Sequence, residues 1–150
     1  MTANVESWNG TSWTEIANVN NATYELAGSG TQTAALKIGG TPNSANTEVW
    51  NGSAWTEVNN LNTGRGGLGA GGTTSTTLAF GGTPDSTKAE DWNGASWSEV
   101  GDLNAGRSKI GGVGSATAAL AFAGDGAPAN FLALTEEWSG SSIASKVLTD

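Results

Sequence analysis

Glutamates recur in this sequence at a fixed spacing, and they are the first residues that could do chemistry. One series lies two residues before a tryptophan, and a second series follows nine residues later. The members are Glu6, Glu48, Glu90 and Glu136, and then Glu15, Glu57 and Glu99. Two neighbouring carboxyl groups can work as general acid and general base. A catalytic pair belongs to one site, however, whereas these pairs recur along the chain, so we expect solvated or arginine-paired structural roles.

Two arginines occupy equivalent places in the repeat and are candidate ligands for an anion. Arg65 and Arg107 lie 42 residues apart, and Thr23 takes the same place one period earlier. A guanidinium group can hold a carboxylate or a phosphate through two parallel hydrogen bonds. We expect instead that each arginine bonds neighbouring carbonyls or a carboxylate such as Glu57 or Glu99.

The chain has no cysteine and no histidine, and this limits its chemistry. Thiol chemistry, disulfides, Cys/His zinc sites and catalytic dyads that need imidazole are excluded. Asp85-Ser86 and Asp125-Gly126 could touch calcium. Neither has the alternating Asp/Asn pattern of a dedicated calcium loop, and both suit turns. We therefore expect no metal, no cofactor and no enzymatic activity.

Charge and hydropathy narrow the range of partners. The 150 residues carry a net charge of −8, which would repel a phosphate backbone or an anionic membrane surface. No apolar run approaches the length that spans a bilayer. The N-terminal residues have neither the basic start nor the apolar segment of a signal peptide. We expect no nucleic acid partner, no membrane partner, no signal peptide and no transmembrane segment.

A tryptophan hairpin repeats along the chain. Its leading tryptophans are Trp8, Trp50, Trp92 and Trp138, which are separated by 42, 42 and 46 residues. The first three are followed by Asn-Gly, the strongest short signal for a hairpin turn. A fixed period in the 40s is typical of arrays of small supersecondary units.

A second tryptophan follows five residues after each of the first three, so that two rings can face each other across the hairpin. Aromatic faces could stack on sugars, but repetition in each unit favours packing between units. Glycines also recur in register. We therefore assign the following residues to the structural core of the repeat: Trp13, Trp50, Trp55, Trp92, Trp97, Gly40, Gly82 and Gly124.

Each period contains four short runs that suit strands. In the second period these are 48–50, 55–58, the glycine-rich run 66–72 and the apolar run 77–82. Glycine inside a strand usually marks a close approach of two backbones. The sequence thus predicts one two-stranded hairpin, from Val5 to Ile16, and three sets of four strands. We interpret residues 1–150 as one domain with a half blade at 1–22 and full blades at about 23–64, 65–106 and 107–150.

Four-stranded units with short connections describe the blades of an all-β propeller. The glycine doublets Gly39-Gly40 and Gly81-Gly82 are each followed by a loop, tryptophans, a leucine and an arginine. This pattern resembles the kelch repeat over nearly the whole chain. Thr23 in the arginine place and Ala123 in the third glycine doublet depart from it. The Trp-Asn-Gly-x-x-Trp hairpin also resembles kelch-like proteins encoded by marine bacteriophages.

These resemblances imply a function. A kelch-like β-propeller would serve as a non-enzymatic binding or structural module. The phage resemblance implies a virion or tail-fibre component that assembles with itself or with other virion proteins and recognises a host-surface glycan. The alternative is a cytoplasmic, cellular scaffold of the kelch type for protein–protein interaction.

About three and a half blades cannot close a ring, because propellers typically use four to eight. An unclosed end would leave a strand edge exposed. We therefore expect a homo-oligomer in which another copy completes the ring, or a larger assembly.

Loops on one rim are the predicted contact surface, since loops on a rigid scaffold tend to carry function. They comprise the loops 41–46, 83–88 and 125–134 and the links 59–64 and 101–106. The last loop is an insertion with two apolar residues, which could instead cover an adjoining protomer. The candidate binding residues are Phe131, Leu132, Asp85, Asp102, Asp125, Arg65 and Arg107.

Overall fold

The structure, a computed structural model, describes residues 2–84, 86–126, 132–140 and 146–147, so the candidates Asp85 and Phe131 lie outside the described residues. The elements in these ranges are all β-strands, and neighbouring strands pair antiparallel. Within the same ranges, nothing helical could cross a membrane. The prediction of an all-β chain is confirmed.

The strands form one hairpin and three four-stranded sheets, which we call the N-terminal hairpin and the first, second and third blades. The N-terminal hairpin contains β1 (Val5–Trp8) and β2 (Trp13–Ile16). The first blade contains β3 (Ala27–Thr31), β4 (Ala34–Ile38), β5 (Thr47–Trp50) and β6 (Trp55–Val58). The second contains β7 (Gly69–Gly72), β8 (Thr77–Phe80), β9 (Ala89–Trp92) and β10 (Trp97–Glu99). The third contains β11 (Gly111–Gly114), β12 (Ala119–Phe122), β13 (Thr135–Trp138) and β14 (Lys146–Val147).

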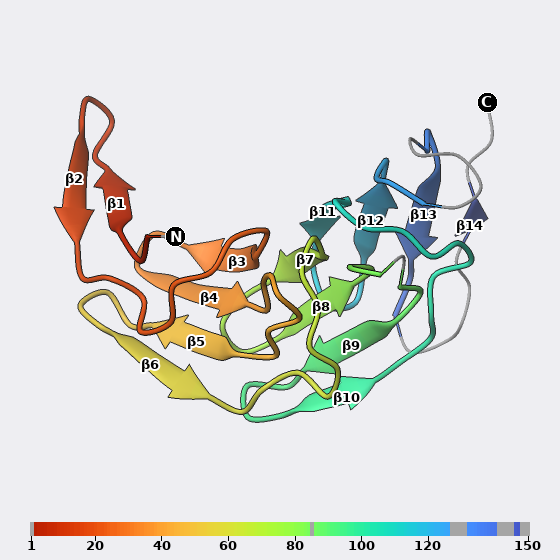
Figure 1. Ribbon diagram of the computed structural model, residues 1–150, viewed down its shortest axis with the longest axis horizontal. Coiled ribbons are helices and arrows are strands. Elements are labelled where there is room, and N and C mark those ends of the chain that lie inside the picture. Colours follow the sequence, from red (N-terminus) through yellow and green to blue (C-terminus); the bar gives the residue numbers. More distant parts are fainter. Residues whose placement is uncertain (1, 85, 127–131, 141–145, 148–150) are drawn as a thin grey trace.

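The sheets follow one another along an open arc, with the N-terminal hairpin at one end and the third blade at the other (Figure 1). The first strand of the second blade, β7, lies beside the first strands of the other two blades, β3 and β11. The arrangement is consistent with the blades of a β-propeller, and the ring is not closed.

The hairpin turns form as the Asn-Gly pairs predict. In the second repeat the Asn51 side-chain oxygen accepts hydrogen bonds from the backbone N–H groups of Ser53 and Ala54, at 3.0 and 2.9 Å. Gly52 has a φ of 94°, which glycine adopts at little cost. The same turn then pairs Trp50 with Trp55 across the two strands.

Two strands of the second blade are shorter than predicted. The glycine-rich strand begins at Gly69 rather than at residue 66, and the apolar strand ends at Phe80 rather than at residue 82. The φ angles of Gly67, Gly81 and Gly82 are 63°, 68° and 117°. These angles lie outside the extended conformation of a strand, so the glycines form bends at the strand ends.

The predicted core glycines allow close backbone contacts. Gly40, Gly82 and Gly124 have φ angles of 126°, 117° and 107°. A Cβ atom at Gly40 would lie 2.3 Å from the Thr23 hydroxyl, and one at Gly124 would lie 2.7 Å from the Ser108 carbonyl oxygen. A side chain at these positions would therefore crowd the link that leads into the first strand of the same blade.

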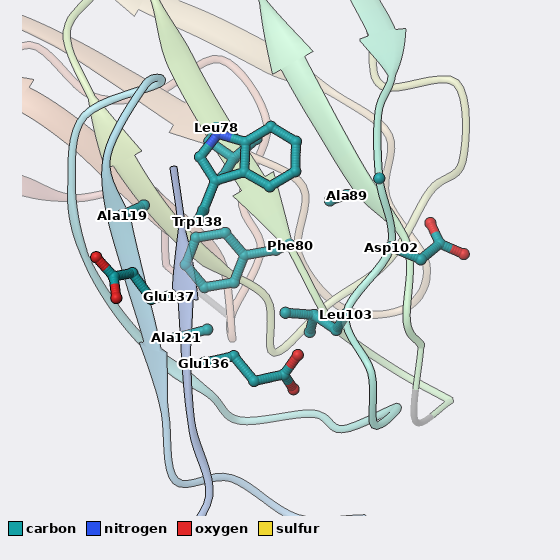
Figure 2. Close-up of a pocket in the computed structure, with 11 residues that line it drawn as sticks. Leu78, Phe80, Ala89, Asp102, Leu103, Ala119, Ala121, Glu136, Glu137 and Trp138 are labelled. Atoms are coloured by element: carbon teal, nitrogen blue, oxygen red, sulfur yellow. The ribbon is translucent and has the colours of Figure 1, made fainter. Parts of the chain in front are cut away.

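Apolar side chains are buried between consecutive blades. Between the first and second blades lie Leu36, Ile38, Leu68, Ala70 and Trp97, and between the second and third lie Leu78, Phe80, Ala89, Ile110, Ala119 and Ala121. Figure 2 shows the second of these interfaces, where Leu78 and Phe80 lie against Trp138. The cavity left there is about 20 Å³, room for about one water molecule. The interface is therefore packing surface and not a site for a larger ligand.

Candidate functional site

Three of the repeated glutamates are buried and paired with a cation. Glu90 and Glu136 are 0% and 2% exposed, and their Oε1 atoms lie 3.2 Å from Arg65 Nη2 and 2.8 Å from Arg107 Nη1. The arginine-paired role was predicted, but the expected partners Glu57 and Glu99 were wrong. Those two side chains lie on the outermost strands of their blades and are exposed.

In the first blade, a lysine instead of an arginine pairs with the buried glutamate. Glu48 is fully buried, and its Oε1 atom lies 3.6 Å from the Nζ atom of Lys37. Lys37 sits opposite Glu48 on the neighbouring strand β4, where the other blades have Ala79 and Ala121. Thr23, in the arginine place, is therefore compensated within the blade. Burial lowers the pKa of Lys37, and the charge of Glu48 opposes that shift.

The link that leads into each blade also bonds the glutamate. The backbone N–H groups of Asn20, Asn62 and Asn104 donate to Oε2 of Glu48, Glu90 and Glu136, at 2.7, 2.8 and 2.7 Å. The side chain of Asn62 donates to Glu90 as well, at 3.0 Å, and to the carbonyl of Trp97 on the outermost strand. We call this set of glutamate, cation and asparagine the latch. A carboxylate held in a latch is shut off from solvent and cannot reach a soluble substrate.

Glu6 has no latch. It occupies the place of Glu48 on the N-terminal hairpin, pairing with Glu15 as Glu48 pairs with Glu57. Its side chain is exposed, and among the described residues none bonds to it or forms an ion pair with it.

A groove of about 610 Å³ lies between the residues that precede and begin β1 and the inner strands of the first blade. Its lining includes Val5, Leu26, Trp55, Gly28–Thr31 and Ala35–Lys37. Leu26 is 41% exposed here, whereas Leu68, its equivalent in the second blade, is 5% exposed. The groove thus occupies a position that a neighbouring sheet covers elsewhere in the molecule.

The outer face of the third blade is open too. Leu120 and Phe122 are 38% and 41% exposed, and the equivalent Leu78 and Phe80 are both 2% exposed. Val113, beside them on β11, is also exposed. We call the surface made by Val113, Leu120 and Phe122 the C-terminal face.

The predicted contact rim is assembled as expected in part. The links lie against the loops: Leu61 N–H donates to the Ala45 carbonyl at 3.0 Å, and Leu103 N–H donates to the Thr87 carbonyl at 2.8 Å. Asp102 is on this rim and accepts a hydrogen bond from the Thr87 hydroxyl at 3.1 Å.

The other predicted binding residues are placed differently. Asp125 forms an ion pair with Lys109 at 3.1 Å. Leu132 is half-buried, and its backbone N–H donates a hydrogen bond to the Gly124 carbonyl at 2.9 Å. Arg65 and Arg107 are buried in latches, which removes them from the contact surface. Among the described residues, no group of acidic side chains is arranged to hold a metal ion.

The tryptophan pairs form in all three Asn-Gly hairpins, with ring centroids 5.5, 5.4 and 5.3 Å apart. Trp50 and Trp92 are buried, and Trp97 is 6% exposed. Trp55 is half-buried, and Trp13 is 63% exposed, which differs from the core position expected for it. Trp97 donates to Thr47 on the preceding blade at 3.2 Å. Trp13 lies on the first sheet of the array, and no sheet precedes it among the described residues.

Asp91 is a residue that the sequence reasoning missed. It lines a groove of about 360 Å³ between the second and third blades, together with Thr76, Ser115, Thr117, Trp92 and Trp138. Its Oδ1 atom is buried without a hydrogen-bond partner among the described residues, and burial raises the pKa of Asp91. The sequence carried little signal, because this place varies along the repeat: it holds Ser7, Val49, Asp91 and Glu137.

Comparison with known proteins adds the fold alone. No family model matches the chain, and no curated protein matches it. Among solved structures, one described as "Structure of YjhT" is similar with a TM-score of 0.79 at 15% sequence identity. The match covers 98% of this chain and 52% of the other, so this chain spans about half the length of that structure. At this identity the likeness shows that both share an arrangement of small antiparallel sheets.

Proposed function

We propose that this protein is a non-enzymatic structural module, a kelch-like set of propeller blades that assembles with further copies of itself to complete a ring. The observation that supports this most strongly is the exposure of Leu120 and Phe122, because the equivalent residues of the second blade are buried by the next blade. Contiguous apolar surface of this kind marks interaction sites on soluble proteins.

The buried latches support the structural role. Each holds an ion pair and several hydrogen bonds inside a blade and fastens the incoming link to it. Breaking one member of a buried pair leaves an uncompensated charge, which costs about 3–5 kcal/mol. The repeated glutamates thus fix the blades, and this leaves the open faces and the rims for binding.

Absolute mass in solution tests the assembly. Light scattering behind a sizing column should give a multiple of the single-chain mass of 15.0 kDa. Replacing Leu120 and Phe122 together by serine should return the protein to the single-chain mass, and Glu57→Ala on the exposed outer strand is the matched control. A single-chain mass for the unchanged protein at every concentration would contradict self-assembly.

The groove at Asp91 favours glycan recognition as a second function. A partly buried carboxylate, hydroxyl groups and tryptophan rings line it. Carboxylates and hydroxyls can bond sugar hydroxyl groups, and indole rings can stack on a sugar's apolar face. This reading extends the resemblance to phage fibre proteins, for which a host-surface glycan is the expected ligand.

A glycan array separates this function from the alternative of a protein–protein scaffold. Selective binding of one sugar class that is lost in Asp91→Asn supports the adhesin, with Asp102→Asn, which does not line this groove, as control. Absence of selective binding favours a scaffold, either in a virion or in the cytoplasm. Binding that Asp91→Asn leaves unchanged would exclude this groove as the site.

A further inference from the structure

Among the described residues, Glu6 is the member of the series Glu6, Glu48, Glu90 and Glu136 that meets no cation, and the surrounding structure indicates what is missing. In each blade the strand that carries the glutamate pairs on both sides: β5 lies between β4 and β6, and β9 lies between β8 and β10. Within the described part of the chain, the corresponding strand β1 pairs with β2 on one side only. The groove of about 610 Å³ lies beside this strand: its lining includes Val5, next to Glu6 in the sequence, and residues of β3 and β4, while Glu6 itself does not line it.

The blades show what fills that place when it is occupied. A link with the sequence Asn-x-x-Arg, at 62–65 and 104–107, delivers the asparagine and the arginine to the glutamate. Two short strands of small and apolar residues follow it, β7 and β8 in the second blade. The groove offers a matching surface, since Val5 and Leu26 are apolar and Gly28 leaves room for a close backbone.

We propose that the groove is a socket for a β-hairpin from a partner polypeptide, and that a basic residue of this hairpin, preceded by asparagine three positions earlier, pairs with Glu6. The hairpin adds to the free edge of β1 by strand addition, a common mode of peptide recognition. A folded second copy is not the donor, because the described hairpins of this kind are held within its own blades. The inference rests on the proposed role in a larger ring: copies of the chain would meet through the C-terminal face, and a different polypeptide would fill the groove at the other end.

Charge distinguishes this partner from any apolar peptide. If a hairpin without a cation covered Glu6, a carboxylate would be buried in the interface without a counter-charge. This burial costs free energy and would oppose binding strongly. Pairing it with arginine restores the latch seen at Glu90 and Glu136. The socket therefore selects basic hairpins although the protein as a whole is acidic, with a net charge of −8.

The test uses the full chain and a synthetic peptide with the sequence of residues 62–83, titrated by calorimetry. The peptide should bind, and replacing its arginine by glutamine should weaken binding by at least about tenfold. Glu6→Gln in the chain should cause the same loss, and combining the two changes should add little. Glu57→Gln, on an exposed outer strand, is the control and should not alter the affinity.

Two results would overturn the proposal: no binding of the peptide, or equal binding of the arginine and glutamine peptides. Neither depends on self-assembly, because the mass of the chain alone is measured without the peptide. A single-chain mass together with charge-dependent peptide binding would reject the homo-oligomer and retain the socket. A higher mass without peptide binding would do the reverse.

Discussion

The second blade and the third blade carry nearly the same residues in very different surroundings. Leu78 and Phe80 are both 2% exposed, whereas Leu120 and Phe122, one period later, are 38% and 41% exposed. The two inner strands of each blade pair in the same register, so the pairing of these strands does not explain the difference in exposure. Whether these side chains are buried therefore depends on the presence of the next sheet in the array. At the end of the array the same apolar side chains are exposed because no sheet among the described residues covers them.

The two ends of the array are not alike. Gly39 and Gly81 allow the following blade to approach, since a Cβ atom there would lie 2.6 Å from the Arg65 carbonyl oxygen and 2.9 Å from that of Arg107. The third blade has Ala123 at this place, with a φ of 55°. A further blade docked in the same register would meet that Cβ atom. The C-terminal face is therefore suited to a neighbour in a different register, whereas the groove at the other end keeps the inner geometry.

The largest difference in unfolding free energy is expected between Phe80, which is buried between the second and third blades, and Phe122, which lies on the exposed C-terminal face. Phe80→Ala should lower the free energy of unfolding by about 3–5 kcal/mol, because it empties a packed interface. Phe122→Ala should change it by less than about 1 kcal/mol in the isolated chain, as expected for an exposed residue. Chemical denaturation of both variants measures this. Equal losses would show that the C-terminal face is already covered.

The buried Glu90 and the exposed Glu6 should also differ in their contribution to stability. Glu90→Gln should cost about 3 kcal/mol, since it leaves Arg65 buried without its counter-charge. Glu6→Gln should stay within about 0.5 kcal/mol of the unchanged protein, because the side chain is exposed and unpaired among the described residues. Urea denaturation at low concentration of protein, where self-assembly is least, provides both values. A large effect of Glu6→Gln there would mean that a cation already reaches it.

The glycine doublets sharpen the contrast between the two ends. Gly81→Ala should cost about 2 kcal/mol, through a left-handed φ of 68° and a clash with the next blade. Ala123→Gly should stabilise the protein by about 0.5 kcal/mol, because relief of the strained φ slightly exceeds the entropy that glycine loses on folding. Thermal unfolding of both variants checks the signs. Destabilisation by Ala123→Gly would show that the alanine makes a contact of its own.

The smallest comparison concerns one hydrogen bond. The indole N–H of Trp97 donates a hydrogen bond to the Thr47 hydroxyl. One period earlier, Trp55 and Val5 occupy the places of Trp97 and Thr47. The indole nitrogen of Trp55 is buried and has no hydrogen-bond partner among the described residues. Val5→Thr should supply the acceptor and raise the free energy of unfolding by about 1 kcal/mol. The matched control is Val5→Ser, which offers a hydroxyl without the methyl group. If Val5→Thr is neutral or destabilising, the two hairpins do not share this geometry.

Much of the fold could be predicted because the repeat carries it. The Asn-Gly turns, the paired tryptophans and the glycine-rich strands are local signals with few alternative readings. The latch could not be predicted so easily, because glutamate is normally exposed and its burial depends on a link from another part of the repeat. Lys37 held a clue, since it is the one charged residue in a column that otherwise contains Ala79 and Ala121.

The exposure of side chains at the two ends of the array could not be predicted from the sequence, for a different reason. Trp13 and Trp97 occupy the same place in the repeat, and nothing local distinguishes their exposures of 63% and 6%. Only the position of each hairpin in the array does so. Asp91 was missed because its place in the repeat is variable and it belongs to no recognised motif.

Completing the N-terminal hairpin within the chain tests whether Glu6 is a latch glutamate without its cation. A copy of residues 62–85 placed ahead of Thr2 would bring the asparagine, the arginine and two strands to Glu6 in the register of the second blade. In this extended chain we predict that Glu6→Gln costs about 3 kcal/mol of unfolding free energy, as in a complete latch. If Glu6→Gln remains within about 0.5 kcal/mol there, Glu6 is not an unfilled latch and the groove is not a hairpin socket.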